Sequence, residues 1–150
     1  MKDQTWGLLE EIFSQDPGLR AEPVSAEEIS AAEAALGMAL SDDYKQFVRR
    51  YGGAMVGPFP VFGLRKAEPM AKTDGSFLDV TKSFRGQRWP GVEKWAVIPV
   101  DHAGNPVGLD AQGKVWISDH DSRVVQEIAS GFEGYVRYCL ALGGRGDLSE

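Results

Sequence analysis

The segment from residue 25 to residue 53 carries start and stop signals for two consecutive helices. Ser25 and Glu28 have the spacing of a capping box, in which a hydroxyl and a carboxylate each accept a hydrogen bond from the other residue's backbone amide. Apolar residues then recur at helical spacing until Gly37, which supplies a left-handed stop. Ser41 stands where a second helix can begin. Two short helices with a brief connection are therefore the strongest local constraint on how this chain folds.

The second helix of this pair has charges where the helix dipole favours them. Asp42 and Asp43 fall in its first turn, near the positive end of the dipole, and Arg49 and Arg50 fall in its last turn. Gly52 and the glycine after it end the helix. Its apolar residues share one face, which is predicted to pack on a core, and they are Tyr44, Phe47, Val48 and Tyr51.

Three flanking segments have weaker patterns. Residues 5–13 are amphipathic in the way that is typical of a short helix. The apolar run within residues 54–69 contains Pro58 and Pro60, which have no amide to donate to a strand ladder, and this favours an edge strand or an extended segment. Residues 77–88 have apolar spacings that permit a helix.

From residue 95 onward the apolar period changes toward two, which is typical of strands. Residues 111–114 have the composition of a turn, and they predict a hairpin between the strands on either side. Ser130 and Glu133 repeat the capping-box spacing and predict a last helix led by Phe132. The predicted strands are residues 95–100, 107–109, 115–117 and 124–128. Helices followed by antiparallel strands and a final helix make an α+β domain.

The length and the cysteine usage indicate the class of protein. A chain of 150 residues suits one domain, residues 1–150, with a core that needs no disulfide. Its first residues include acids where a secretory signal needs basic and then apolar residues, and no apolar run approaches the length of a membrane span. Cys139 is the single cysteine, so we expect a reduced, cytoplasmic protein. A frayed tail is expected over residues 143–150.

The net charge of −6 is unevenly distributed along the chain. Acids outnumber bases in residues 1–50 and 101–150, whereas bases outnumber acids in residues 51–100. An acidic chain repels phosphates, which disfavours direct binding to nucleic acid. The acidic segments would instead steer a basic protein partner, unless the charge serves only solubility.

The two histidines, His102 and His120, each stand beside acids. Asp101 precedes the first, and Asp119 and Asp121 flank the second. Such groups can form a metal site or an acid–base pair. A metal needs three or four converging ligands, and the segment after Asp101 does not fit a calcium loop, so hydrogen bonds that shape two loops are the favoured interpretation. If the predicted hairpin pairs, both clusters fall on the same sheet edge, where they would contact a partner.

Other reactive or basic side chains have two interpretations each. Trp116 lies in a predicted strand, where core packing is favoured, but an outward indole would suit a binding hot spot. Lys82, Arg85 and Arg88 can form a basic stripe on a helix, and a solvated face is favoured over a contact for phosphate or an acidic partner. Cys139 lies on the apolar side of its helix, which favours a core thiol over a nucleophile.

Three segments, taken in order, resemble the SUKH superfamily, which groups bacterial immunity proteins with relatives of the fungal Smi/Knr cell-wall assembly regulator. They are FVRRYGG at the end of the helix pair, WAVIPVDHAGNPVGLDAQGKVWISDHD over the predicted hairpin, and ASGFEGYVRYCL over the last helix. The resemblance covers residues 25–142 and implies a twisted antiparallel sheet with helices packed on one face. A serine stands where a proline often precedes the acidic turn, and Gly-Gly stands where Asn-Gly is common, but both changes keep the cap and stop chemistry.

The resemblance also implies a role. Many bacterial members bind and neutralise a toxin of a contact-dependent or polymorphic toxin system, and the superfamily has no shared catalytic apparatus, so we expect no enzyme activity and no cofactor or metal. The alternative is a regulatory scaffold related to the cell-wall assembly regulators; an enzyme would require both histidines to converge in one deep pocket. The expected partner is a toxin domain, for instance a basic nuclease. The residues expected to contact it are Asp42, Asp43, Asp101, His102, Trp116, Asp119, His120 and Asp121.

Overall fold

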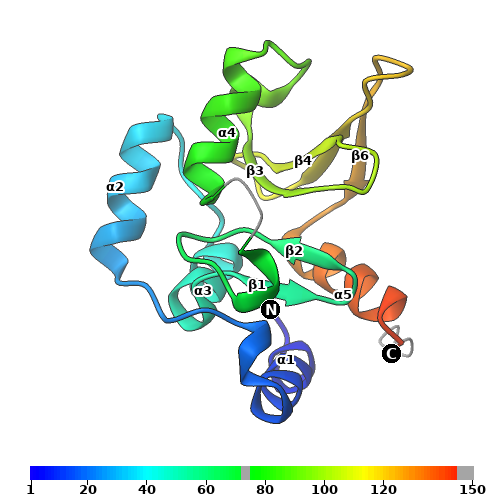
Figure 1. Cartoon of the computed structure of the whole chain (residues 1–150). Helices are drawn as coiled ribbons and strands as arrows, with labels where there is room; N and C mark the ends of the chain where they lie inside the picture. Colours follow the sequence, from blue (N-terminus) through cyan, green and yellow to red (C-terminus); the bar gives the residue numbers. More distant parts are fainter. Residues whose placement is uncertain (72–74, 145–150) are drawn as a thin grey trace.

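The computed structural model describes residues 1–71 and 75–144 (Figure 1). The five α-helices within these residues are α1 (Asp3–Gln15), α2 (Ala26–Leu36), α3 (Asp42–Tyr51), α4 (Phe77–Gly86) and α5 (Phe132–Leu142). The strands are β1 (Ala54–Val56), β2 (Phe59–Val61), β3 (Ala96–Val100), β4 (Pro106–Leu109), β5 (Val115–Ser118) and β6 (Val125–Ala129). Most of the predicted tail, from residue 145 on, lies outside the described residues. Among the described helices, none combines the length and apolar character that crossing a bilayer requires.

The strands form two antiparallel sheets. β1 and β2 make a two-stranded ribbon, and the larger sheet has the order β3-β4-β5-β6. The ribbon meets this larger sheet where the Phe62 amide, just after β2, donates a hydrogen bond of 2.6 Å to the Ile98 carbonyl of β3. In the region 54–69, Pro60 lies within β2 and Pro58 lies in the ribbon turn, in keeping with the expected edge strand.

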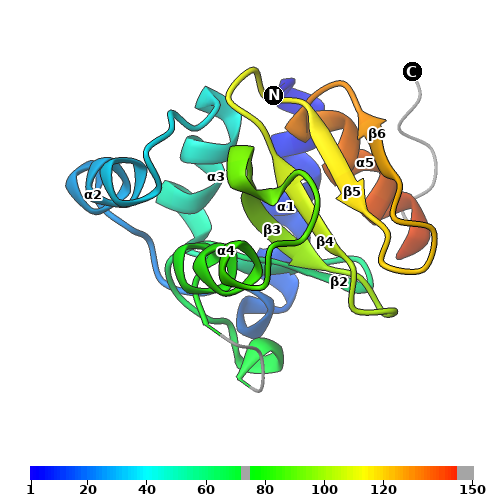
Figure 2. The ribbon, with the colours of Figure 1, turned by 90° about the horizontal axis from the view of Figure 1, so that it is seen from above.

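Two helices pack against strands of the larger sheet. α4 contacts β3, and α5 contacts β6 (Figure 2). The Thr81 hydroxyl of α4 accepts a hydrogen bond of 2.7 Å from the Val97 amide and so ties this helix to β3 within the core. The chain therefore has the α+β fold that its order of elements predicts.

A cluster of aromatic rings joins the helices below the sheet. The Phe47 ring of α3 lies between the rings of Tyr51, in the same helix, and Phe132, in α5. The centroid of each of these two rings is 5.3 Å from the Phe47 centroid, in edge-to-face geometry. Tyr44 approaches the same Phe132 ring at 5.3 Å, and Phe13 of α1 meets Tyr51 at 4.7 Å. These five side chains are buried, so the predicted apolar face of the second helix is the centre of the core.

The first capping box forms as predicted. The Ser25 hydroxyl accepts a hydrogen bond of 3.1 Å from the Glu28 amide, and the Glu28 carboxylate accepts one of 3.2 Å from the Ser25 amide. Gly37 ends the helix with φ of 70°, in the left-handed region. The local sequence signals are sufficient here because both partners belong to one turn.

At two other helices, the capping hydrogen bonds that the sequence predicts do not form. Ser41 occupies the N-cap position of α3, but its hydroxyl donates to the Asp43 carboxylate at 2.9 Å and caps no amide. The prediction of a capping box at Ser130 fails because Gly131 is the N-cap of α5. The Glu133 carboxylate instead accepts hydrogen bonds from the Lys2 amide at 2.8 Å and the Thr5 hydroxyl at 2.7 Å. Glu133 therefore contacts Lys2 and Thr5 at the start of the chain in place of the local capping hydrogen bond.

Candidate functional site

The two histidine–acid clusters lie on the β3–β4 and β5–β6 loops, at the same end of the larger sheet. Asn105 joins them. Its side-chain amide donates to the Asp101 carboxylate at 3.3 Å, and its side-chain oxygen accepts a hydrogen bond of 3.1 Å from the His120 amide and lies 2.6 Å from His120 Nδ1. Asn105 is only 6% exposed, so a buried side chain holds the two loops together. The structure thus brings the two clusters together, as the hairpin pattern predicts.

Each loop is also held by its own aspartate. Asp101 Oδ1 accepts hydrogen bonds from the amides of Ala103 at 2.9 Å and Asn105 at 2.8 Å. Asp119 Oδ1 accepts one of 2.9 Å from the Asp121 amide. The favoured interpretation of these acids as loop-shaping groups is confirmed.

Three side chains of the β5–β6 loop come close enough to share an ion. One potential ligand atom from each of Asp119, His120 and Asp121 lies within 4.8 Å of the others. These groups already have internal partners, because His120 Nε2 lies 3.1 Å from the Asp121 carboxylate and His120 Nδ1 faces Asn105. The geometry is that of a braced loop with exposed polar atoms.

Basic residues stand beside this loop. A small pocket of about 170 Å³ is lined by Arg88, Trp89, Asp119, His120 and Arg123, among others. The Trp89 and His120 rings are 5.8 Å apart in edge-to-face geometry. The end of the sheet is therefore a surface of mixed charge and not a uniformly acidic one.

His102 projects from the other loop onto an aromatic ring. Its imidazole lies 4.7 Å from the Phe59 ring of β2, with an angle of 36° between the planes. His102 and His120 consequently contact different aromatic residues, Phe59 and Trp89. His120 lines the pocket of about 170 Å³, and His102 is not among the residues that line it.

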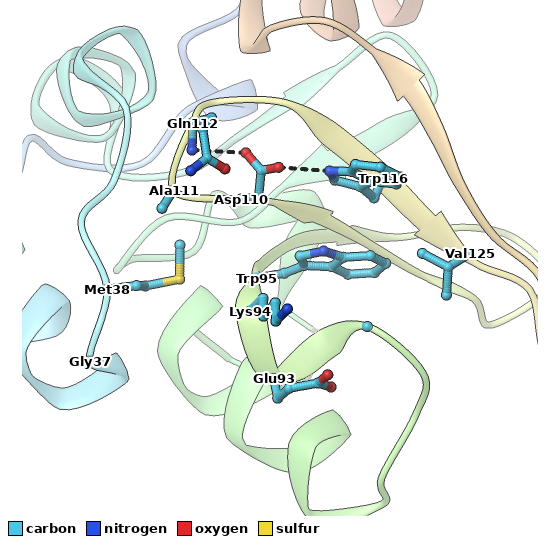
Figure 3. Close-up of a pocket in the computed structure, with 11 residues that line it drawn as sticks. Gly37, Met38, Glu93, Lys94, Trp95, Asp110, Ala111, Gln112, Trp116 and Val125 are labelled. Atoms are coloured by element: carbon cyan, nitrogen blue, oxygen red, sulfur yellow. Dashed lines mark hydrogen bonds between the residues drawn. The ribbon is translucent and has the colours of Figure 1, made fainter.

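Trp116 lines a groove of about 510 Å³ on one face of the sheet (Figure 3). It is half-buried, and its indole N–H donates a hydrogen bond of 2.9 Å to the Asp110 carboxylate. Asp110 also accepts hydrogen bonds of 2.9 Å from the amides of Gln112 and Lys114 in the β4–β5 turn. The polar partner of Trp116 is therefore in this turn.

The second tryptophan of this groove fits against a glycine. Gly108 pairs with Trp116 across β4 and β5, and a Cβ atom at Gly108 would lie 2.5 Å from the Trp95 ring. Gly108 thus leaves the space that the buried Trp95 side chain occupies. In Figure 3, Met38 enters the groove from the connection after α2. A glycine between two strand tryptophans is the sequence signal that could have predicted this groove.

Asp42 and Asp43 lie away from the two histidine loops. A Cβ atom at Gly113 of the β4–β5 turn would lie 3.3 Å from the Ser41 side chain, which places the start of α3 at the opposite end of β4 and β5. Asp42 has a side chain that is 93% exposed, 3.6 Å from the Lys45 ammonium. Asp43 accepts a hydrogen bond of 2.9 Å from the Tyr44 amide. These two acids form a separate patch.

Arg85 corrects the expectation of a solvated basic stripe. Its half-buried guanidinium donates to the carbonyl oxygens of Leu36 at 3.0 Å, Val92 at 3.1 Å and Trp95 at 3.0 Å. Burial lowers the pKa of Arg85, although the nearby Glu93 carboxylate opposes this effect. The guanidinium is a structural clamp between α4, the end of α2 and the residues before β3.

Comparison with known proteins supports the resemblance that the sequence suggests. Residues 23–137 match the model of the SMI1 / KNR4 family (SUKH-1). A comparison with curated proteins finds no match. The matched range contains both histidine loops and all the strands, whereas α1 lies before it. Because the match spans well over half of its length, this chain belongs to the SMI1/KNR4 (SUKH-1) family.

Proposed function

We propose that this chain is a bacterial, cytoplasmic immunity protein that binds a cognate toxin domain and neutralises it by covering it. The proposal supposes no chemical step by the chain itself. Family membership supports it, since the resemblance implies both the role and the lack of a shared catalytic apparatus. The two alternatives that belong to other classes, a regulatory scaffold and an enzyme, are outcomes of the experiments below.

The observation that carries the proposal is the joining of two polar loops through Asn105. Loops that are already held in one conformation lose little conformational entropy on binding, so more of the contact energy appears as affinity. The side chains that these loops present are the predicted contact residues Asp101, His102, Asp119, His120 and Asp121. They are exposed or half-buried, whereas the Asn105 that braces them is buried.

Trp116 and the start of α3 supply two further proposed contacts. Trp116 is held in one orientation by Asp110 while part of its ring stays accessible, and such tryptophans are common anchors in interfaces. Asp42 and Asp43 would add long-range attraction to a basic toxin, for instance a nuclease. Their separation from the histidine loops means that the toxin must be large to contact both.

Coexpression tests the proposal. A candidate toxin domain from the same genome is produced in bacteria with and without this chain, and growth and co-purification are measured. Rescue of growth together with a stable complex is expected. Co-purification with a non-toxic partner would favour the regulatory scaffold, and the absence of both rescue and complex would reject this toxin as the partner.

Variants at the loop surface sharpen the experiment. Asp121→Lys changes an exposed side chain in the proposed interface, and Glu11→Lys makes the same charge change on the exposed face of α1. We expect D121K to weaken rescue and E11K to preserve it. Equal effects of the two substitutions would show that the histidine loops do not form the contact surface.

A further inference from the structure

The exposed apolar side chains gather on two neighbouring elements. Within residues 1–71 and 75–144, the large hydrophobic residues that are exposed are Val124, Ile128, Tyr138 and Leu142. The first precedes β6, the second lies in β6, and the other two belong to α5. β6 is also the last strand of its sheet, whereas β3 at the other side meets Phe62. Clustering of this kind marks an interaction surface.

A groove of about 470 Å³ runs between β6 and α5. Val107 and Ile117 line it from the sheet, and Tyr135 lines it from α5 as a buried residue. Phe59 and Tyr138 line it as more accessible residues, the latter 56% exposed. The site therefore has a buried apolar base and an accessible aromatic edge.

Aromatic rings form two pairs around this groove. Tyr135 and Tyr138 have centroids 6.4 Å apart at an angle of 38°. Phe59 is backed by His102 at 4.7 Å. The faces of such rings carry negative partial charge and attract cations.

Acids add negative charge to the same site. Asp101 and Glu127 both line the groove, and its described lining residues include no lysine or arginine. Asp101 shares this lining with the buried Tyr135, whose pKa is raised chiefly by burial. Glu127 has Lys114 at 3.7 Å as a partner. Asp101 Oδ1 already accepts two backbone amides, whereas Asp101 Oδ2 accepts one long hydrogen bond of 3.3 Å from Asn105, so Oδ2 is the acidic atom that can receive a ligand.

We propose that the β6–α5 groove binds a lysine or arginine side chain presented by a protein partner. The methylene groups would pack between Tyr138 and Phe59, and the charged end would approach Asp101. The tryptophan groove is a poorer candidate because Lys94 lines it and would repel a basic side chain. This binding goes beyond the proposed immunity function, because any protein partner that presents a lysine or arginine side chain could occupy the groove.

Small peptides test the groove directly. Acetyl-Val-Arg-Val-amide is titrated into the full chain and followed by ¹H–¹⁵N NMR, with acetyl-Val-citrulline-Val-amide as the neutral isostere. We expect saturable shifts at Ile128, Tyr135 and Tyr138, and about fivefold weaker binding of the citrulline peptide. Equal binding of both peptides, or shifts confined to other surfaces, would overturn the proposal.

Variants separate ring-face attraction from general packing. Tyr138→Leu removes the aromatic face at an exposed position, and Tyr138→Phe keeps it. We expect the preference for arginine over citrulline to fall severalfold in Y138L and to persist in Y138F. Loss of this preference in both variants, or in neither, would contradict the role of the ring. Because free peptides are the probe, this inference can fail while the toxin-binding proposal stands.

Discussion

The side-chain oxygen of Asn105 accepts a hydrogen bond from the His120 backbone amide at 3.1 Å and lies 2.6 Å from the Nδ1 atom of the same residue. One buried amide thereby holds the β5–β6 loop against the β3–β4 loop, where it also donates to Asp101. Two loops that are separate in sequence become one surface, and the family membership of the chain gives this surface a proposed purpose.

Substituting Asn105 should loosen both loops at once. Asn105→Ala removes the hydrogen bonds that the buried Asn105 side chain makes to Asp101 and His120, so the free energy of unfolding should fall by about 1–3 kcal/mol. Urea denaturation measures this loss, and amide NMR shifts should change in both loops. Gln112→Ala, an exposed change in the β4–β5 turn, is the control and should have little effect. Shifts limited to the β3–β4 loop would show that the bridge is weak.

Two helix-ending glycines provide a matched pair. Gly37 and Gly52 both have φ of 70°, but a Cβ atom at Gly37 would meet no atom within 4 Å, whereas one at Gly52 would lie 2.0 Å from the Glu22 carbonyl oxygen. Gly37→Ala should cost about 1–2 kcal/mol for the left-handed conformation alone. Gly52→Ala should cost a further ~1–3 kcal/mol because the backbone of residue 22 must move. Similar denaturation midpoints for the two variants would disprove the close backbone contact.

Alkaline pH should destabilise the chain through its buried thiol. Burial raises the pKa of Cys139 from 9.0 to about 11, so the folded state retains a proton that the unfolded state has lost between these values. Stability is complete below pH 9 and falls as pH rises, by about 1.4 kcal/mol at pH 10 from this group. Denaturation at pH 8 and pH 10 measures the loss. Cys139→Ala should show a smaller decrease, and an equal decrease in both proteins would assign the effect to other groups.

Glu133 should anchor α1 to α5. Burial raises the pKa of this carboxyl, but hydrogen bonds from Thr5 and Lys2 and the charge of Arg137 outweigh burial and lower it overall. The stabilisation is therefore present above the ordinary value of 4.5 and is lost as pH falls through the lowered pKa. Glu133→Ala removes the acceptor of both hydrogen bonds, so it should cost about 1–3 kcal/mol and speed hydrogen exchange in α1. Glu11→Ala, on the exposed side of α1, is the control; unchanged exchange in E133A would contradict the anchor.

Association with a basic toxin should depend on salt. The net charge of −6 and the exposed Asp42 and Asp121 favour attraction at a distance, so raising the ionic strength should slow association by about tenfold while changing dissociation less. Stopped-flow measurements at low and high salt give the rates. A flat dependence would reject the electrostatic part of the proposal.

Features that depend on nearby residues could be read from the sequence. The capping box of Ser25, the stop at Gly37 and the apolar face of α3 each involve residues within a few positions, and all are present. The alternation after residue 95 likewise predicted the strands of the larger sheet. In these cases the periodicity and the cap chemistry determine the element without long-range information.

Features that depend on competing partners could not be read in the same way. Ser130 and Glu133 have capping-box spacing, but Glu133 accepts hydrogen bonds from Lys2 and from Thr5 of α1, which are remote in sequence. The bridge through Asn105 depends on how two loops meet in space, and the spacing of residues does not reveal it. The indole of Trp116 similarly selects Asp110 after the β4–β5 turn has formed.

Titrating the activity of a purified cognate toxin with this chain tests the central claim most directly. If the chain neutralises by covering its partner, activity should fall in proportion to the amount added and reach zero at one equivalent. Inactivation of excess toxin by a small fraction of an equivalent, increasing with time, would reveal turnover and contradict the account.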